Sequence, residues 1–580
     1  MKNLIKPLLM TMVLSASALE QAAAQSENKL IIYQMLPRLF GNKQTNNVPY
    51  GTLEQNGSGK FNDITDKALS GIKELGTTHI WYTGVIAHAS LTDYSAFGLP
   101  AADADVVKGR AGSPYAIRDY YDVDPDLAVD VKNRMAEFEA LLKRTHQHGL
   151  KVIIDFVPNH VARTYKSNAK PAGVIDFGAQ DDANKAFSAK NDYYYIPGKP
   201  FVVPEGTQDA GPLSALKDER FDENPAKATG NDVFSERPSK DDWYETVKLN
   251  YGVDYQNNRA THFDPIPPVW LKTRDILIYW ARKGADGFRC DVAEMVPVEF
   301  WHWVIPEVKK VKPGIVFIGE AYNPKAYSTY LTQGKFDYLY DKVGLYDGLK
   351  RLMRNEEHAK VADIDYVWQQ ESAGFGDHML RFLENHDEER VASKAFAGDP
   401  FLAIPAMVVS ATLSGGPVML YSGQEVGEPG NDKEGYSGED GRTTIFDYWG
   451  VKEHQKWMND GAFDGGKLSE SQVHLRNFYK QVLTVAGTAR AIVKGKFYHL
   501  PMNNKLYAYI RYTENQRLLV FVNFDRNERF DSTIEIPAAL LEHKKINSAR
   551  DILTGTQIHH PSDHSIHVVA GPGSAQIIEF

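Results

Sequence analysis

Four acidic residues stand at or just after the C-terminal ends of predicted strands: Asp155, Asp291, Glu320 and Asp387. The C-terminal ends of the strands of a parallel barrel meet at one rim, so these side chains would lie together. One Asp at a strand end is typically a helix cap. Four carboxylates on one rim raise each other's pKa and lower stability, which indicates a function.

Cleavage of a glycosidic bond requires such a cluster. One carboxylic acid protonates the leaving oxygen, and a carboxylate opposite attacks the sugar or activates water. A third carboxylate can stabilise the developing positive charge. Arg289 precedes Asp291 by two positions and therefore points to the same side of its strand. We expect it to keep Asp291 ionised, although a purely structural ion pair is the alternative.

Short apolar runs that end in polar residues recur along the chain and suit strands buried on both faces of a parallel sheet. The eight runs are residues 30–40, 79–85, 151–160, 287–293, 315–322, 336–342, 379–387 and 417–425. Helical patterns lie between them, for example 133–149 and 270–284, each closed by a glycine. This alternation predicts an α/β fold, a (β/α)8 TIM barrel, with a doubly wound sheet as the competitor.

Two regions depart from the alternation. Residues 161–265 are too long for a usual strand-to-helix loop, which predicts a subdomain inserted after strand 3. Residues 489–580 contain short alternating strands and predict a C-terminal antiparallel β-sandwich domain. The catalytic barrel would then span residues 25–488.

Residues 1–24 have the features of a signal peptide, with Lys2 and Lys6 before the apolar run 8–14 and Ala22–Ala24 before a cleavage site at Gln25. The run is too short to anchor the chain in a bilayer, and no cysteine near the site would accept a lipid. We therefore expect an exported protein, periplasmic or secreted, with no membrane anchor after cleavage. A cytosolic start with chance hydrophobicity is the alternative.

Composition limits the partners. The net charge of −10 and the absence of basic runs argue against nucleic-acid binding, which needs a basic face. The single cysteine, Cys290, allows no intrachain disulfide and is expected to pack outside the barrel. Aromatic clusters at Tyr193–Tyr195 and at Trp243–Tyr244 could stack on sugars, but a small core is the favoured interpretation.

Four segments, DFVPNH, GFRCDVAEM, FIGEAY and FLENHD, resemble in this order the signature segments of the α-amylase superfamily, glycoside hydrolase family 13. GGPVMLYSGQE and SPYAIRDYYDVDP resemble two further family segments, so the resemblance extends over roughly residues 30–450. Family members have a barrel, a subdomain after strand 3 and a C-terminal β-domain. The resemblance therefore implies the organisation that the apolar runs predict.

The resemblance also implies roles. Asp291 would be the nucleophile, Glu320 the acid and then the base, and Asp387 a ligand of the sugar hydroxyls. The supporting substrate-binding residues would be Tyr115, His160, Arg289 and His386, while Asp155 would support the rim. The family retains configuration, which requires the carboxyls of Asp291 and Glu320 to lie roughly 5–5.5 Å apart.

Departures from the family leave two questions open. Glu294 and Met295 stand where many α-amylases have a Lys-His pair that binds sugars, which puts endo-acting starch binding in doubt. The residue after Tyr115 is Ala116, where relatives often have Asp. Asn159 matches a calcium-binding position of many members, but the loop 54–64 carries few acids. We expect the reaction to need no cofactor. Whether a structural calcium ion binds at Asn159 is left open by the sequence.

We therefore predict a retaining α-glycoside hydrolase of α-glucans, malto-oligosaccharides or related α-glucosides, which would place it in starch or maltodextrin degradation. A transglycosylase on the same site is the nearest alternative. A catalytically inactive sugar-binding protein is a third, although it should lack at least one of the three carboxylates. Linkage, endo or exo action and oligomeric state are not determined by the sequence.

Overall fold

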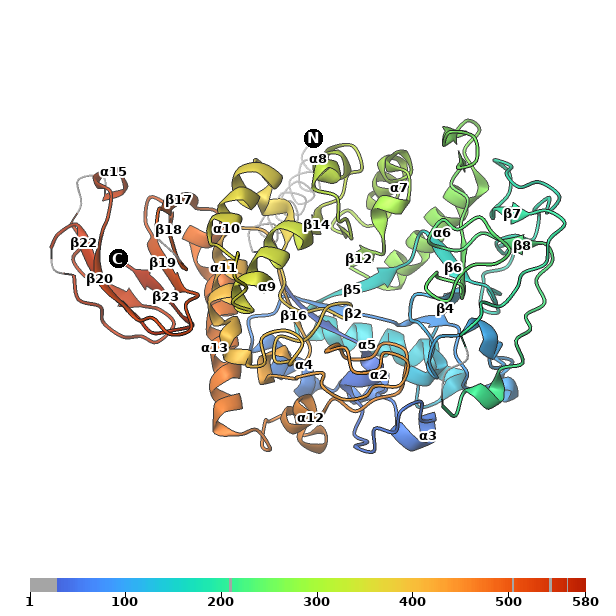
Figure 1. Cartoon of the computed structure of the whole chain (residues 1–580), viewed down its shortest axis with the longest axis horizontal. Helices are drawn as coiled ribbons and strands as arrows, with labels where there is room; N and C mark the ends of the chain where they lie inside the picture. The colour runs from blue at the N-terminus through green and yellow to red at the C-terminus, as the bar shows by residue number, and fades with distance from the viewer. Residues whose placement is uncertain (1–28, 208–210, 503–504, 542–544, 561) are drawn as a thin grey trace, which may run out of the picture.

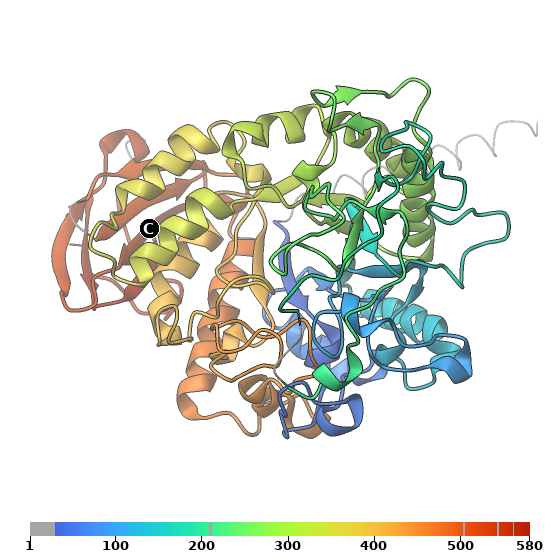
Figure 2. The ribbon, with the colours of Figure 1, turned by 45° about the vertical axis from the view of Figure 1, so that its right-hand side comes forward.

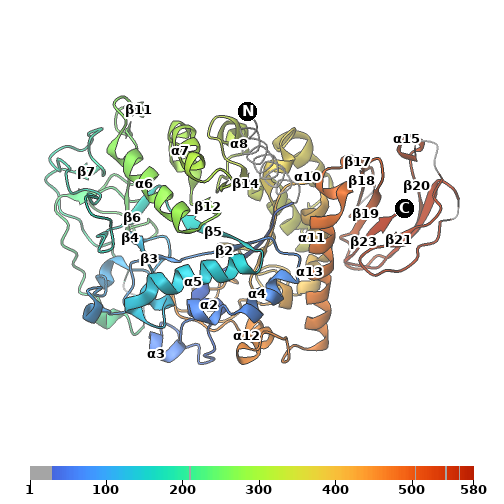
Figure 3. The same ribbon diagram turned by 180° about the vertical axis from the view of Figure 1, so that it is seen from behind.

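The computed structural model describes residues 29–207, 211–502, 505–541, 545–560 and 562–580. The predicted signal peptide lies outside these residues. A central barrel carries an inserted subdomain of small sheets at one end of the molecule and a C-terminal β-domain at the other (Figure 1). The view from behind shows the same three parts in the same order (Figure 3).

The barrel is an eight-stranded parallel sheet in the order β15-β14-β13-β12-β5-β2-β1-β16. Its strands are β1 (Ile31–Met35), β2 (His79–Tyr82), β5 (Lys151–Phe156), β12 (Gly287–Cys290), β13 (Val316–Gly319), β14 (Tyr338–Tyr340), β15 (Met379–Leu380) and β16 (Val418–Tyr421). A parallel bridge between Arg381 and Val418 brings the two edge strands together and nearly closes the barrel. The predicted (β/α)8 barrel is thus confirmed.

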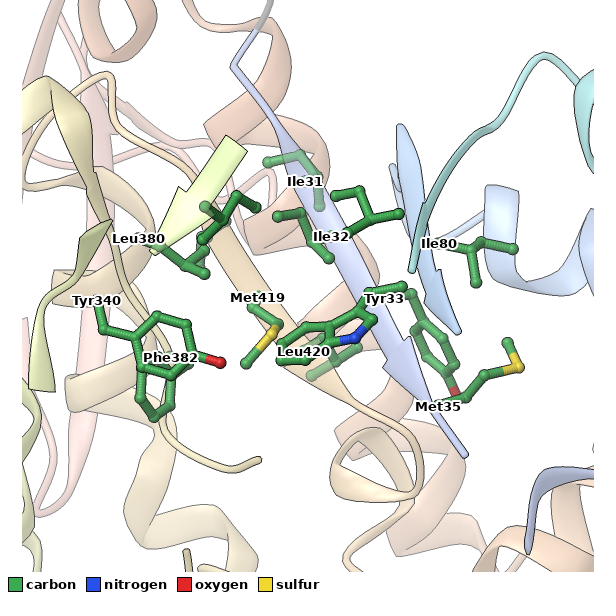
Figure 4. Close-up of a cluster of buried hydrophobic side chains, with 14 of the residues drawn as sticks. Ile31, Ile32, Tyr33, Met35, Ile80, Tyr340, Leu380, Phe382, Met419 and Leu420 are labelled. Carbon is green, nitrogen blue, oxygen red and sulfur yellow. The ribbon is translucent and has the colours of Figure 1, made fainter. Parts of the chain in front are cut away.

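The apolar runs form strands because both faces of the sheet are covered. Ile31, Ile32 and Ile80 have no exposed surface. Figure 4 shows buried side chains of β1, β14, β15 and β16 packed together on the strands of the barrel, and the rings of Tyr340 and Phe382 lie 5.1 Å apart. Close packing of this kind fixes the strand register, and with it the height of each polar residue at the rim.

One principal helix follows each barrel strand and packs on the outside of the barrel (Figures 1 and 3). These helices are α4 (Asp66–Lys73), α5 (Arg134–Gln147), α6 (Pro268–Lys283), α7 (Val298–Val311), α8 (Pro324–Thr332), α9 (Asp347–Met353), α11 (Ile404–Thr412) and α13 (Glu470–Thr488). The shorter helices are α2 (Pro37–Phe40), α3 (Leu53–Asn56), α10 (Ala362–Tyr366), α12 (Lys452–Met458), α14 (Arg490–Val493) and α15 (Ala538–Leu541). In the described part of the chain, every helix is too short or too polar to span a bilayer.

The inserted subdomain consists of two-stranded sheets beside the antiparallel pair β3 (Ile86–His88) and β4 (Ile117–Val123). Its pairs are β6 (His160–Ala162) with β9 (Thr246–Lys248), β7 (Tyr195–Ile196) with β8 (Ala226–Lys227), and β10 (Val253–Asp254) with β11 (Ala260–Thr261). In the β6–β9 pair, His160 lies opposite Lys248. This pairing holds β9 beside the segment that follows β5. Tyr193–Tyr195 and Tyr244 are buried, as a small core requires.

The C-terminal domain is antiparallel, as predicted. A five-stranded sheet contains β17 (Lys496–Leu500), β18 (Leu506–Tyr512), β19 (Arg517–Asn523), β23 (Ser574–Glu579) and β21 (Arg550–Asp551), and β20 (Phe530–Glu535) pairs with β22 (Ser565–Ala570). Residues of both sheets share one apolar core. The domain packs against the outer helices of the barrel (Figure 2). There, the hydroxyls of Thr412 on α11 and Tyr509 on β18 form a hydrogen bond of 2.6 Å.

Candidate active site

Arg289 on β12 is the centre of the rim cluster. Its side chain is fully buried, with Nη1 2.8 Å from Asp291 Oδ1 and 3.2 Å from Asp155 Oδ1, and Nη2 2.7 Å from Glu320 Oε2. The register explains the meeting, because Arg289 lies beside Asp155 of β5 and beside Ile318 of β13, two residues before Glu320. One guanidinium thus joins carboxylates from three neighbouring strands.

Aromatic rings surround this guanidinium. Its central carbon lies 5.4 Å from the ring centroids of Trp81 and Tyr115 and 5.5 Å from that of Tyr340. Nε donates to the Tyr340 hydroxyl at 3.1 Å. Burial disfavours the charge, but the neighbouring carboxylates and Tyr340 raise the pKa of Arg289 well above its ordinary value. Arg289 therefore remains a cation inside the barrel.

Asp291 is a carboxylate in an environment that resists its charge. Burial raises its pKa well above the ordinary value, Glu320 adds to that rise, and Arg289 opposes it. A nucleophilic carboxylate must be ionised. The ion pair with Arg289 is the contact that favours this form.

Glu320 is held at both oxygens. The Tyr322 hydroxyl donates to Oε1 at 2.5 Å, and the Val292 backbone N–H donates to Oε2 at 2.7 Å. Val292 reaches this position with φ 36°, in the left-handed region that a β-branched residue rarely occupies. Strained backbone of this type persists where surrounding contacts enforce it and is concentrated at functional sites. Here the strain directs one amide of the chain, just after Asp291, to Glu320.

Asp387 lies beside His386, whose Nε2 is 2.9 Å from Asp387 Oδ2. Burial raises the pKa of Asp387, but His386, Arg289 and Arg442 together outweigh burial and lower the pKa to about 2. The side-chain nitrogen of Gln34 lies 2.8 Å from Nδ1 of the same imidazole. With that amide as donor, Nδ1 accepts and Nε2 carries the proton that Asp387 accepts. The Tyr115 ring stacks on His386, with centroids 5.2 Å apart.

A cavity of about 270 Å³ opens at this rim. Its lining residues are Lys108, Ser113, Tyr115, His160, Trp243, Glu245, Thr246, Asp291, Val292, Glu320, Tyr322, Asp387, Ile445 and Phe446. This volume is near the small end of ligand pockets, so the enclosed part fits few sugar rings. Trp243, which we expected in the core of the subdomain, lines the cavity instead and lies 5.2 Å from the His160 ring.

The structure thus places Tyr115, His160, Asp291, Glu320 and Asp387 on the lining of one cavity. Arg289, Asp155 and His386 contact these residues from within the barrel. Cys290 is fully buried and burial raises the pKa of its thiol, as suits a packing residue.

Several contributors did not emerge from the sequence: Gln34, Trp81, Tyr322 and Tyr340. Gln34 could have been singled out from the sequence, because it is an amide residue inside the otherwise apolar segment Ile31–Met35. The aromatic residues could not, because aromatic side chains in buried strands are normally core.

The surroundings of Asn159 do not fit a calcium ion. Its Oδ1 accepts from Lys248 Nζ at 2.6 Å, and its Nδ2 donates to the Gly230 carbonyl at 2.7 Å. Lys248 is buried and also lies 2.5 Å from Asp232 Oδ1. Calcium requires six to eight oxygen ligands at about 2.3–2.6 Å, whereas here an ammonium already holds the oxygen. Among the described residues, no three acidic, His or Cys side chains gather as a metal site would need.

Glu294 and Asn56, two other positions raised by the sequence, also have structural partners. Glu294 Oε2 accepts from the Asn323 backbone N–H at 3.1 Å. Asn56, in the loop 54–64, accepts from the Val48 backbone N–H and donates to the Val48 and Tyr448 carbonyls. Both side chains thus have partners within the protein.

Known proteins resemble this chain over most of its length. The α-amylase 3 of Dictyoglomus thermophilum is 22% identical over 95% of this chain and 93% of its own length, and the neopullulanase 2 of Thermoactinomyces vulgaris is 22% identical over 91% and 74%. Among solved structures, the α-amylase of Geobacillus thermoleovorans complexed with acarbose superposes with a TM-score of 0.62 at 19% identity, covering 95% of this chain and 98% of that one. The family model described as alpha amylase, catalytic domain, matches residues 34–461. This match, over a rim that holds the expected carboxylates, shows that the chain belongs to the α-amylase family of glycoside hydrolases.

Proposed function

We propose that this enzyme is a retaining hydrolase of α-glucans, malto-oligosaccharides or related α-glucosides. The observation that carries the proposal is the single guanidinium of Arg289, which contacts Asp291 at 2.8 Å and Glu320 at 2.7 Å. Two carboxyls on adjacent nitrogens of one guanidinium are close neighbours. That suits the short separation of retaining glycosidases, about 5–5.5 Å, better than the wider one that an inverting water needs.

The proposed reaction has two displacements. Asp291 attacks the anomeric carbon while Glu320 gives its proton to the departing glycosidic oxygen, so that a glycosyl ester forms and the leaving sugar is released as an alcohol. Glu320, now a carboxylate, takes a proton from water, which attacks the same carbon and frees Asp291. Asp387, ionised because of His386, stabilises the positive charge of both transition states.

A conservative variant tests the assignment. Asp291→Asn removes the nucleophile without changing its shape, and we expect hydrolysis of malto-oligosaccharides to fall by at least about 10⁴-fold, a loss typical of an essential nucleophile. Circular dichroism and thermal unfolding should show a folded protein. Activity within tenfold of the wild type would disprove the role of Asp291, and an inverted product in wild-type NMR assays would disprove retention.

Transfer to a sugar acceptor is the second candidate, since relatives of this chain include an α-1,4-glucan:maltose-1-phosphate maltosyltransferase, 23% identical over 83% of this chain. The same glycosyl ester serves both reactions, and the acceptor decides between them. Product analysis of maltotriose with added maltose distinguishes the candidates. Products longer than the substrate as the major fraction would favour the transferase.

The proposal includes export. The basic, apolar and small-residue segments of residues 1–24 support cleavage before Gln25. N-terminal sequencing of the mature protein tests this, and a retained Met1 would contradict it.

A further inference from the structure

Tyr322 shares the cavity lining with Glu320, two residues earlier in the chain. Ala321 between them is fully buried, so the segment after β13 presents these two side chains to the cavity and the third to the protein interior. The Tyr322 hydroxyl donates to Glu320 Oε1 at 2.5 Å. The proposed reaction assigns no role to this hydroxyl, although it contacts the group that must move a proton.

The two oxygens of Glu320 have different surroundings. Oε2 accepts from the Val292 backbone N–H at 2.7 Å and lies 2.7 Å from Nη2 of Arg289. An amide donor and a cation both disfavour a proton on the oxygen that they contact. At Oε1, the Tyr322 hydroxyl occupies one of two lone pairs and leaves the other for a proton. Oε1 is therefore the oxygen better suited to carry the acid proton.

The hydroxyl of Tyr322 is a hydrogen-bond donor and not a second acid. Burial, Glu320 and Asp387 raise the pKa of Tyr322 well above its ordinary value, so it keeps its proton throughout. A hydrogen bond to a carboxylate is stronger than one to a neutral carboxyl. The bond from Tyr322 therefore strengthens as Glu320 loses its proton, and an interaction that strengthens toward the transition state accelerates the reaction.

The segment that carries Tyr322 is fixed by the turn that follows the nucleophile. The Ala293 N–H donates to the Glu320 carbonyl at 3.0 Å, and the Asn323 N–H donates to Glu294 Oε2 at 3.1 Å. These two bonds hold the backbone on both sides of Tyr322. Glu294, at one of the two positions where the chain departs from many α-amylases, thus helps to keep the hydroxyl at Glu320.

We propose that Oε1 of Glu320 delivers the proton to the leaving oxygen and that Tyr322 is the positioning residue for this transfer. As the bond between the anomeric carbon and the leaving oxygen breaks, its electron pair passes to that oxygen, which takes the proton from Oε1. The bond from Asp291 to the anomeric carbon forms in the same step, and the Tyr322 hydroxyl stabilises the carboxylate left on Glu320. This inference rests on the proposed function, in which Glu320 is the acid.

Two aryl α-maltosides test this role, because their leaving groups have similar shapes but differ in their need for a proton. 4-Nitrophenolate is a stabilised anion, whereas 4-methoxyphenolate is not. In Tyr322→Phe, we expect kcat/KM for 4-methoxyphenyl α-maltoside to fall by about 10–100-fold, as the loss of a hydrogen bond to a charged group provides. The fall for 4-nitrophenyl α-maltoside should be less than about threefold, since it needs little general acid catalysis. The loss should lie in kcat and not in KM.

Two further variants give the comparison its scale. Glu320→Gln removes the acid itself, so it should show the same selective loss to a greater degree, by about 10²–10⁴-fold on the methoxyphenyl substrate. Tyr330→Phe is the matched control, because the Tyr330 hydroxyl donates to the Glu294 and Val296 carbonyls, both at 3.1 Å, beside the same turn. It should leave the ratio of the two rates at the wild-type value.

The outcomes separate this inference from the proposed function. An equal loss on both substrates in Tyr322→Phe would show that the hydroxyl acts through sugar binding or folding, and it would overturn the inference. An unchanged rate on both substrates would do the same. If Glu320→Gln itself lacked the selective loss, or if the wild type cleaved neither aryl α-maltosides nor α-glucans, the proposed function would fail instead.

Discussion

Two surfaces of the cavity are built in different ways. We call the barrel cluster of Asp155, Arg289, Asp291 and Glu320 the floor, and the segment Trp243–Lys248 of the inserted subdomain the wall. The floor comes from adjacent strands whose hydrogen-bonded register sets every height. The wall comes from a segment attached to the barrel through the β6–β9 pair. The floor therefore supports the reaction itself, while the wall can vary and select what reacts.

The two surfaces also hold their positive charges differently. Arg289 on the floor is planar and reaches three carboxylates at once. Lys248 on the wall is a point charge between one carboxylate and one amide oxygen. Loss of the first should alter catalysis and its pH dependence, and loss of the second should alter the stability of the wall.

Among the variants that compare the floor with the wall, the largest effect is expected from Arg289→Gln. Burial already raises the pKa of Asp291, and Arg289 is the charge that opposes the rise. Without that charge the pKa rises further, so Asp291 ionises only at higher pH. We expect the acid limb of the kcat/KM profile to move up by about one to three pH units. At neutral pH, kcat should fall at least about 100-fold, a loss typical of removing one preorganised electrostatic group.

Tyr340→Phe is the control on the floor. It removes only the hydroxyl that accepts from Arg289 Nε at 3.1 Å and leaves the ring and the charge in place. Its acid limb should stay within about half a pH unit of the wild type. An unmoved limb in Arg289→Gln would contradict the role of the guanidinium and remove the contrast with the wall.

A smaller effect, on stability, is expected from Lys248→Met. The variant leaves Asp232 and Asn159 without their cation, and Asp232 is 30% exposed, so water compensates part of the loss. We expect the free energy of unfolding to fall by about 2–3 kcal/mol, measured in urea. Lys199→Met, at an exposed pair of the same subdomain, should change it by less than about 1 kcal/mol.

The same measurement addresses calcium. Because Lys248 holds the Asn159 oxygen, we expect neither EDTA nor added calcium to change the thermal midpoint or the activity of the wild type. A rise of the midpoint with calcium would show that an ion does bind near Asn159.

The smallest effect is expected from Val292→Gly, at the strained residue that follows the nucleophile. Glycine accepts φ 36° without strain but is more flexible when unfolded, so stability should rise by at most about 1 kcal/mol. The amide that holds Glu320 becomes less constrained, and kcat should fall severalfold. Val296→Gly is the matched control at an ordinary extended backbone, where losing a buried side chain should destabilise by about 2 kcal/mol or more. A large destabilisation in Val292→Gly would mean that the position is not strained.

The sequence by itself determined the barrel, the C-terminal domain and the carboxylates of the rim. Strands of a parallel sheet can be recognised in the sequence as continuous apolar runs, because both faces of the sheet are buried. A polar residue at the C-terminal end of such a run can then be assigned to the rim of the barrel. Arg289 was predictable for the same reason, since residues two apart on a strand face one side.

Only the tertiary structure decided the rest of the cavity. Gln34 contacts His386 because closing the barrel brings β1 near the segment that follows β15, far away in the chain. Tyr340 of β14 contacts Arg289 of β12 across the intervening strand β13. Lys108 meets Glu245, and Lys248 takes the oxygen of Asn159, because an irregular subdomain folds back on the rim. Such contacts cannot be predicted from sequence periodicity, because the conformation of loops depends on packing between distant segments and not on a local repeat.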